Sequence, residues 1–244
     1  MALAPVDHRP QPRLSAGQLA DYLAATSMLS QMGILRGAKY PTEARPLVIQ
    51  YQHARKAIAG CLAAPGNANR IAAQAIVSLE QKQDDPASRP LIRDDARRSI
   101  EVIRAFQGTL NELGLGGIRF DLPPARPPTL VINGVEISVF PDLIAHVPSR
   151  NGERVGSVFI RCTIGGDGDA AENRRADANI HLATIAHMHS VETLDSRGTP
   201  HSQASLVIDV PRVRVTRGPT NTTLRVRNIE AACSMIAGAM PESW

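Results

Sequence analysis

Apolar positions recur every three or four residues through the first half of the chain, which is the spacing of one face of an α-helix. Ser15 precedes the first run and predicts a capped helix that ends at Gly33 and Gly37. Further helices are predicted over 47–63, from Asn67 or Asn69, and from Pro90 to the glycines at 114–117. We therefore expect a flexible arm over 1–14 and a helical domain over 15–119, as a small bundle or a set of packed hairpins.

From Phe120 the pattern changes to short β-branched runs separated by turn residues. A proline-rich linker comes first, and Asn133-Gly134 then divides TLVINGVEISVF as a hairpin turn would. PDLIAHV, VGSVFIRCTI and SLVIDV continue the extended pattern, and helices are predicted at about 172–192 and from Thr222 or Thr223 onward. The order β-β-β-α-β-α predicts a mixed-sheet domain over 120–244. The fold class is therefore α+β, an N-terminal helical bundle followed by a mixed β-sheet domain.

Composition removes some functions and leaves others open. Aromatic residues make up 3% of the chain, too few for the stacking platforms that bind single-stranded nucleic acid. Residues 1–120 hold fifteen Lys or Arg against ten acids, whereas residues 121–244 hold twelve against thirteen. A modestly basic helical half is compatible with a phosphate-rich partner, but it is also common on ordinary proteins, where it is a solvated surface.

The beginning of the chain, MALAPVDHRPQPRL, has no apolar run typical of a secretory signal, and no stretch reaches the ~20 apolar residues of a membrane span. Cys61, Cys162 and Cys233 are far apart and outside any CxxC spacing. They are predicted to be reduced, buried thiols. A cytoplasmic protein with no membrane partner is the expectation.

The second half resembles a known enzyme family. Successive strands with Pro141-Asp142 near the second, then VGSVFIRCT, a helix and SLVIDV, resemble the core of the PD-(D/E)XK nuclease superfamily over about residues 128–240. The chain is also similar to a group of uncharacterised bacterial proteins in which a helical region precedes such a core. The resemblance implies Mg²⁺ held by carboxylates against a scissile phosphate, with a lysine near the attacking water.

Position by position, the resemblance makes Asp142 the first carboxylate and the metal ligand, and it brings Arg161 to the region of the (D/E)XK signature. Residues 156–161 contain no acid and no lysine, and the last lysine of the chain is Lys82. Arg161 can grip a phosphate but hardly takes a proton from water. We therefore expect a catalytically degenerate, nuclease-like protein that contacts DNA or RNA.

Five arginines follow the last strand: Arg212, Arg214, Arg217, Arg225 and Arg227. The alternation of Arg212 and Arg214 with Val213 and Val215 predicts one strand face that could hold phosphates. The alternative is an edge strand that its charges protect against aggregation. A second alternative for the whole protein is an interaction or assembly protein without a nucleic-acid role, with the helical half as its docking surface.

Histidines are also candidates. His146 follows Asp142 by four residues and would share its strand face. His181, His187 and His189 lie on one predicted helix, but their offsets do not form the i, i+4 pair that a metal requires. We interpret these three as ordinary surface or core histidines.

Overall fold

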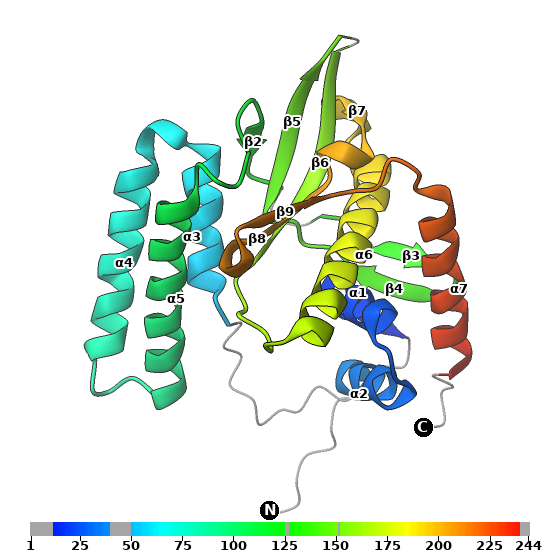
Figure 1. Cartoon of the computed structure of the whole chain (residues 1–244), viewed down its shortest axis with the longest axis horizontal. Coiled ribbons are helices and arrows are strands. Elements are labelled where there is room, and N and C mark those ends of the chain that lie inside the picture. The colour runs from blue at the N-terminus through cyan, green and yellow to red at the C-terminus, as the bar shows by residue number, and fades with distance from the viewer. Residues whose placement is uncertain (1–11, 40–49, 125–126, 151, 240–244) are drawn as a thin grey trace, which may run out of the picture.

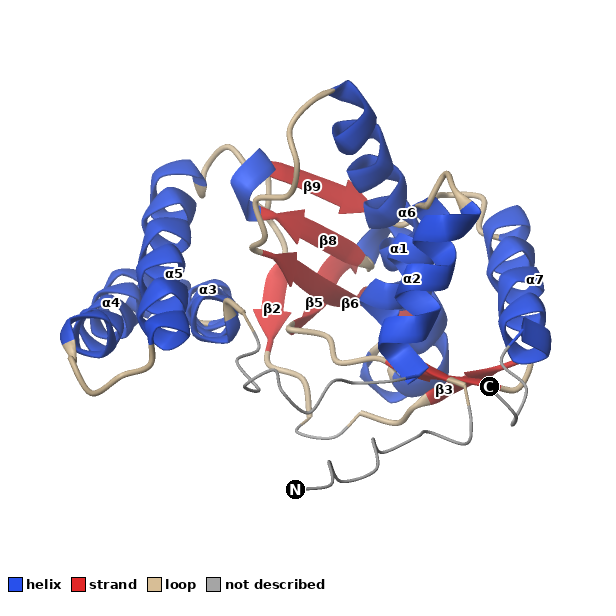
Figure 2. Ribbon diagram, turned by 90° about the horizontal axis from the view of Figure 1, so that it is seen from below, coloured by secondary structure: helices blue, strands red, loops and turns tan. Residues whose placement is uncertain are grey.

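A computed structural model describes residues 12–39, 50–124, 127–150 and 152–239. It confirms the α+β class, with N-terminal helices followed by a mixed sheet (Figure 1). The chain folds as α-helices on both faces of one central sheet, with a small second sheet at one side (Figure 2).

The first predicted helix is two helices. Ser15 caps α1 (Ala16–Ala24) through a reciprocal capping box with Gln18, but α1 ends at Ala24 and α2 (Met28–Lys39) follows. The expectation that Gly33 and Gly37 end the helix was wrong. A glycine inside an exposed helix costs only about 1 kcal/mol, so α2 continues through both.

The next three helices pack against one another. They are α3 (Gln52–Ala63), α4 (Ala68–Asp84), which follows a short 3₁₀ turn at Pro65–Asn67, and α5 (Pro90–Thr109). Residues 47–49 of the predicted second helix lie outside the described residues. Pro90 occupies the first turn of α5, where its missing N–H costs nothing.

The central sheet contains β2 (Arg119–Asp121), β5 (Leu143–Ser149), β6 (Gly152–Arg161), β8 (Leu206–Asp209) and β9 (Arg214–Arg217) in that spatial order. Only the β6–β8 pair in this order is parallel, and α6 (Asp169–Thr193) makes the crossover between these two strands. A short strand, β7 (Thr199–Pro200), pairs with the other end of β6. β9 lies at an edge of the sheet.

The small sheet has the order β1 (Arg13–Ser15), β4 (Val135–Ser138), β3 (Leu130–Ile132). Asn133 and Gly134 have φ of 46° and 82°, so the predicted hairpin turn is confirmed. Arg13 and Leu14 pair with β4, which corrects the expectation that they belong to a flexible arm. The hairpin also stands in a different sheet from β5, so the predicted strands do not form one continuous sheet.

Two hydrophobic cores lie on opposite faces of the central sheet (Figure 2). One joins α3–α5 to the sheet and includes Ile58, Phe106, Leu143, Val158 and Leu206. The other joins α1, α6, the small sheet and α7 (Thr223–Ala239), and includes Leu19, Ile137, Phe159, Ile185 and Ile236. The region expected as one helical domain over 15–119 therefore divides: α1 packs on α6, and α3–α5 pack on the opposite face.

Candidate functional site

Asp142 stands directly before β5, and both its carboxylate oxygens are already bound. Oδ1 accepts hydrogen bonds from Nε and Nη2 of Arg55 on α3, at 3.0 and 2.8 Å, and Oδ2 accepts from the backbone N–H of Ile160, at 2.7 Å. The Asp142 side chain is 9% exposed. Burial raises the pKa of this carboxyl, and Arg55 and the Ile160 amide oppose that rise. The contacts tie α3 to the sheet.

A metal site around Asp142 finds little support in its neighbours. Among the described residues, no group of three or more His, Cys, Asp or Glu is arranged to hold a metal ion. Burial, with Asp142 nearby, raises the pKa of the Cys162 thiol to about 12, so this sulfur stays protonated and is a poor ligand. Cys61, Cys162 and Cys233 are free and buried, as predicted. The residues around Asp142 therefore do not fit the Mg²⁺ that the family resemblance implies.

Arg161 ends β6 and binds elements on the other face of the sheet. Its Nη2 donates to Oδ1 of Asp21 on α1, at 2.7 Å, and its Nη1 donates to Oδ1 of Asn179 on α6, at 3.0 Å. Asp142, by contrast, is held by α3. The structure therefore does not bring Asp142 and Arg161 together as a pair of catalytic groups.

A buried ion pair at the end of β8 was not predicted from the sequence. Asp209 accepts from Nε and Nη2 of Arg175, at 2.5 and 2.7 Å, and from Nδ2 of Asn179, at 3.0 Å. The exposed fractions of the Arg175 and Asp209 side chains are 11% and 1%. One signal existed: Asp209 is the second-last residue of SLVIDV, and the carboxyl ends of parallel strands are where α/β sheets place polar groups.

A cavity of about 370 Å³ opens beside this pair, between α1, α2 and the beginning of α6. Its lining includes Arg161, Arg174, Arg175 and Asp21, together with Gly165 and Gly166. Arg161 and Arg175 are held by the acids described above. Among the described residues, Arg174 forms no hydrogen bond or ion pair, so it is the one guanidinium of the three that could bind a further anion.

Arg212 and Arg214 do not share a strand face, which corrects the expectation from their alternation. Arg212 lies in a 3₁₀ turn (Val210–Arg212), and Val213 has a left-handed φ of 47°, so β9 begins only at Arg214. Arg212 donates from Nε to Oε1 of Glu172 on α6, at 2.6 Å. This contact is the main cause that lowers the pKa of Glu172.

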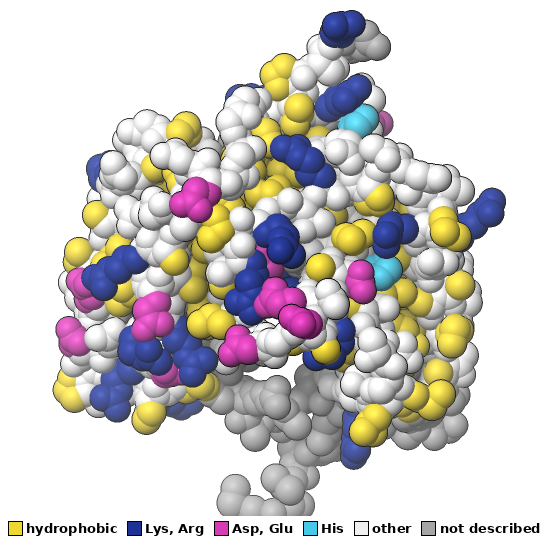
Figure 3. Space-filling view, viewed as in Figure 1, with side chains coloured by type: hydrophobic (Ala, Val, Ile, Leu, Met, Phe, Trp, Pro, Cys, Tyr) yellow, Lys and Arg dark blue, Asp and Glu magenta, His cyan; other side chains and the backbone are white. Residues whose placement is uncertain are grey.

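The remaining four arginines form what we call the arginine band: Arg214, Arg217, Arg225 and Arg227. Arg214 and Arg217 are exposed on β9, and Arg225 and Arg227 lie in the first turns of α7. Arg217 donates to the carbonyl oxygen of Gln203, at 3.1 Å. Within the part of the chain that the structure describes, no band arginine forms an ion pair with an acid. Figure 3 shows Lys and Arg side chains along the course of β9 and again toward α7.

Two of the candidate histidines, His146 and His181, are explained by the residues around them. His146 is buried, with Nδ1 2.8 Å from Oε2 of Glu153 and Nε2 3.1 Å from Oδ2 of Asp121, so it links β2, β5 and β6 away from Asp142. Burial lowers the pKa of His181, and the nearby Arg225 adds to this effect.

Comparison of the chain with protein-family models, curated proteins and solved structures gives no match. Among the described helices, none combines the length and the apolar character needed to cross a membrane.

Proposed function

We propose that this protein is a nuclease-like, non-cleaving protein that contacts the phosphate backbone of nucleic acid through the arginine band. One observation carries the proposal. Residues 212–227 contain five arginines and no acid, and only Arg212 is ion-paired among the described residues. Glu172 on α6 offsets part of this charge at Arg212 and Arg214, and the mutual repulsion of the remaining guanidinium groups favours an anionic partner or solvent ions.

The residue types favour phosphates over bases as the contact. Guanidinium groups bind phosphate oxygens in a bidentate manner, and contacts of this kind position a protein on nucleic acid without reading its sequence. Base recognition on single strands would require aromatic stacking, and the chain has only four Phe, three Tyr and one Trp.

The state of Asp142 supports the absence of cleavage. A nuclease of the resembling family needs carboxylates free to hold Mg²⁺, whereas Asp142 is bound by Arg55 and by the Ile160 amide. The part of β6 next to Asp142, residues 156–161, has neither an acid nor a lysine. The order β5–β6–α6–β8, with β6 and β8 parallel, supports the family resemblance at the level of topology only.

The test is the salt dependence of binding, measured by fluorescence anisotropy with labelled duplex DNA and RNA. The variant Arg214→Gln/Arg225→Gln/Arg227→Gln should weaken binding and flatten the plot of log K against log salt concentration. The slope should fall by about 0.9 for each DNA phosphate that the variant no longer neutralises, or roughly 3 for the triple variant.

A matched control is Arg70→Gln/Arg89→Gln/Arg93→Gln, which removes three exposed arginines from the helical half. We expect it to bind as the unmodified chain does. Equal losses of affinity in the two variants would mean that binding depends on the total positive charge of the protein, and this would contradict the arginine band as the contact. If the protein binds neither nucleic acid, or binds with an affinity that does not vary with salt, the proposed phosphate contact is wrong. The alternative, an interaction or assembly protein without a nucleic-acid role, would then be preferred.

A further inference from the structure

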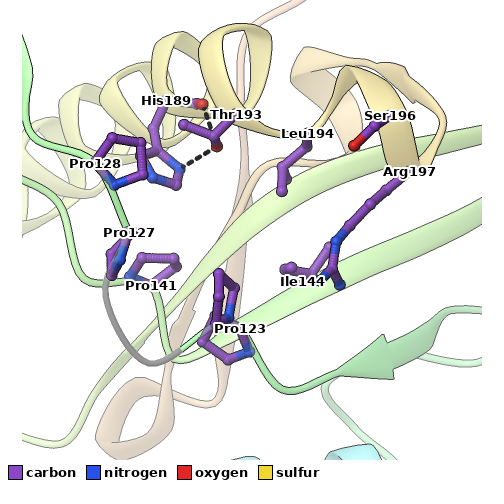
Figure 4. A pocket seen from close by; sticks show the side chains of 11 residues that line it. Pro123, Pro127, Pro128, Pro141, Ile144, His189, Thr193, Leu194, Ser196 and Arg197 are labelled. Atoms are coloured by element: carbon purple, nitrogen blue, oxygen red, sulfur yellow. Dashed lines mark hydrogen bonds between the residues drawn. The ribbon is translucent and has the colours of Figure 1, made fainter.

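A second cavity, of about 260 Å³, lies beside the C-terminal end of α6 (Figure 4). Four prolines that lie between β2 and β3 form one wall, and Pro141 with Ile144 forms another; the four are Pro123, Pro124, Pro127 and Pro128. Leu194 adds a further apolar side chain. Two basic side chains also line the cavity, His189 from α6 and Arg197 from the 3₁₀ turn that follows it. The lining therefore combines apolar rings and side chains with several polar groups that could orient a small molecule.

His189 supplies a buried polar atom without a partner. The residue is 2% exposed, its Nδ1 lies 2.8 Å from Oγ of Ser157, and among the described residues its Nε2 has no hydrogen-bond partner. Figure 4 shows the ring beside Pro128 and facing Pro141. Proline side chains carry no hydrogen-bonding group, so these rings offer Nε2 no side-chain partner.

The surrounding hydroxyl groups decide which ring nitrogen carries the proton. The hydroxyl of Ser190 donates to the carbonyl oxygen of Ala186, at 2.7 Å, and that of Thr193 donates to the carbonyl oxygen of His189, also at 2.7 Å. Oγ of Ser157 is oriented to accept from the Ser190 hydroxyl, 3.1 Å away, and not to donate to it, so we assign the Ser157 hydroxyl hydrogen to Nδ1 of His189, 2.8 Å away.

The ring is neutral at neutral pH, because burial lowers the pKa of His189 to about 4. A neutral imidazole that accepts at Nδ1 carries its proton on Nε2. Among the described residues this buried N–H donor lacks an acceptor, and a buried donor left unsatisfied is destabilising, which favours a ligand that supplies one.

Arg197 provides the second polar group. Its side chain is exposed and extends toward Ile144, away from His189 (Figure 4). Within the described part of the chain it forms no ion pair or hydrogen bond. A guanidinium at the mouth of an apolar cavity suits a carboxylate, which it binds in a bidentate manner.

We propose that this cavity binds a small aromatic carboxylate. The ring of the ligand lies between the proline rings, Ile144 and Leu194, its carboxylate pairs with Arg197, and an oxygen at its other end accepts from Nε2–H of His189. The cavity volume of about 260 Å³ restricts the ligand to a small molecule. The site shares no residue with the arginine band, so the two proposals stand or fall separately.

The test is a titration of the full chain, labelled with ¹⁵N-histidine, with 4-hydroxybenzoate, benzoate, the neutral 4-hydroxybenzamide and inorganic phosphate. We expect the free protein to show the His189 proton on Nε2, and 4-hydroxybenzoate to shift that signal in a saturable way. Arg197→Gln should weaken 4-hydroxybenzoate about tenfold and leave the amide unchanged, because the variant removes the charge-assisted hydrogen bonds to the carboxylate. Arg154→Gln, an exposed arginine outside the cavity, is the matched control and should change neither.

His189→Phe should bind benzoate and 4-hydroxybenzoate equally, because the partner of the ligand hydroxyl is gone. Should that variant fail to fold, the contact between the ligand hydroxyl and His189 is tested by the ratio of the 4-hydroxybenzoate affinity to the benzoate affinity. This ratio is measured in the unmodified chain and in Arg197→Gln. Three results would overturn the proposal. These are no saturable shift with any ring-bearing probe, equal effects of phosphate and 4-hydroxybenzoate, or an Nε2 proton that contacts only a trapped water and ignores every probe.

Discussion

Two acids at the ends of central strands, Asp142 and Asp209, are held by arginines from distant parts of the chain. Arg55 reaches Asp142 across 87 residues of sequence, and Arg175 reaches Asp209 across 34. A buried carboxylate without such a partner would be strongly destabilising, so each pair fixes the position of one helix against the sheet. The charged residue that looked most catalytic in the sequence is thus a structural one in its present surroundings.

Asp142→Ala should therefore lower stability without removing an activity. The substitution leaves the Arg55 guanidinium and the Ile160 N–H without their acceptor, and about 1–3 kcal/mol should be lost, since Arg55 is still one-third exposed. Urea unfolding followed by circular dichroism measures the loss. Asp94→Ala on α5 is the control: this partly exposed acid pairs only with the exposed Arg97 and Arg98, so the change should cost at most about 1 kcal/mol.

The unmodified chain and Asp142→Ala also decide whether the protein cleaves nucleic acid, in an assay with labelled DNA and RNA in Mg²⁺ or Mn²⁺. We expect no cleavage by either. Cleavage by the unmodified chain that disappears in Asp142→Ala would contradict the non-cleaving proposal and establish a divergent metal site.

At the scale of elements, local signals in the sequence predicted most helices and one hairpin. Ser15 with Gln18, Pro90 and Asn133-Gly134 each act on their immediate neighbours, so their effect can be read without the rest of the fold. The end of α1 at Ala24 has no glycine or proline to announce it. The left-handed Val213 and the pairing of β1 with β4 depend on contacts made far along the chain. The site pairs Arg55–Asp142 and Arg175–Asp209 were unpredictable for the same reason.

The approach of β6 to the segment before β8 depends on Gly156. A Cβ at this position would collide with the backbone of Ala204 and Ser205, which cannot move as a flexible side chain would. Gly156→Ala should cost about 2–4 kcal/mol, because strands β6 and β8 must separate. Gly108→Ala on α5 is the matched control: nothing lies near its Cβ, and helix propensity should leave it neutral or stabilise it by up to about 1 kcal/mol. Equal chemical unfolding midpoints for the two variants would contradict the close approach.

At the scale of the molecule, one central sheet has a hydrophobic core on each face, and each core contains a different set of buried polar groups. The face toward α3–α5 contains the Arg55–Asp142 pair, whereas the α6 face contains Asp209, Asn179 and His189 together with Ser157 and Ser190. Both cores include residues of β6 and β8, so neither set of helices keeps its core when these two strands separate. We infer that the chain unfolds as one cooperative unit, and its pH dependence is then the sum over both faces.

That sum predicts destabilisation in mild acid. Burial lowers the pKa of His189 to about 4, and it also lowers the pKa values of His53, His181 and His187. These histidines have folded-state pKa values below their unfolded values, so the unfolded chain takes up protons first as the pH falls below about 6.5. His189 alone should cost at most about 3 kcal/mol by about pH 4.

The carboxyl of Asp142 acts in the opposite sense, because its pKa is raised, and it offsets part of this loss. The midpoint of urea unfolding should therefore decrease between about pH 7 and pH 5, and His189→Phe should flatten that decrease. The signal must come from the far-ultraviolet circular dichroism of the helices, since the single tryptophan, Trp244, lies outside the described residues. A midpoint that stays constant over this range would mean that the α6 histidines are as accessible to protons in the folded chain as in the unfolded one. The sealed His189 site, and with it the neutral Nε2–H donor on which the ligand proposal depends, would then be wrong.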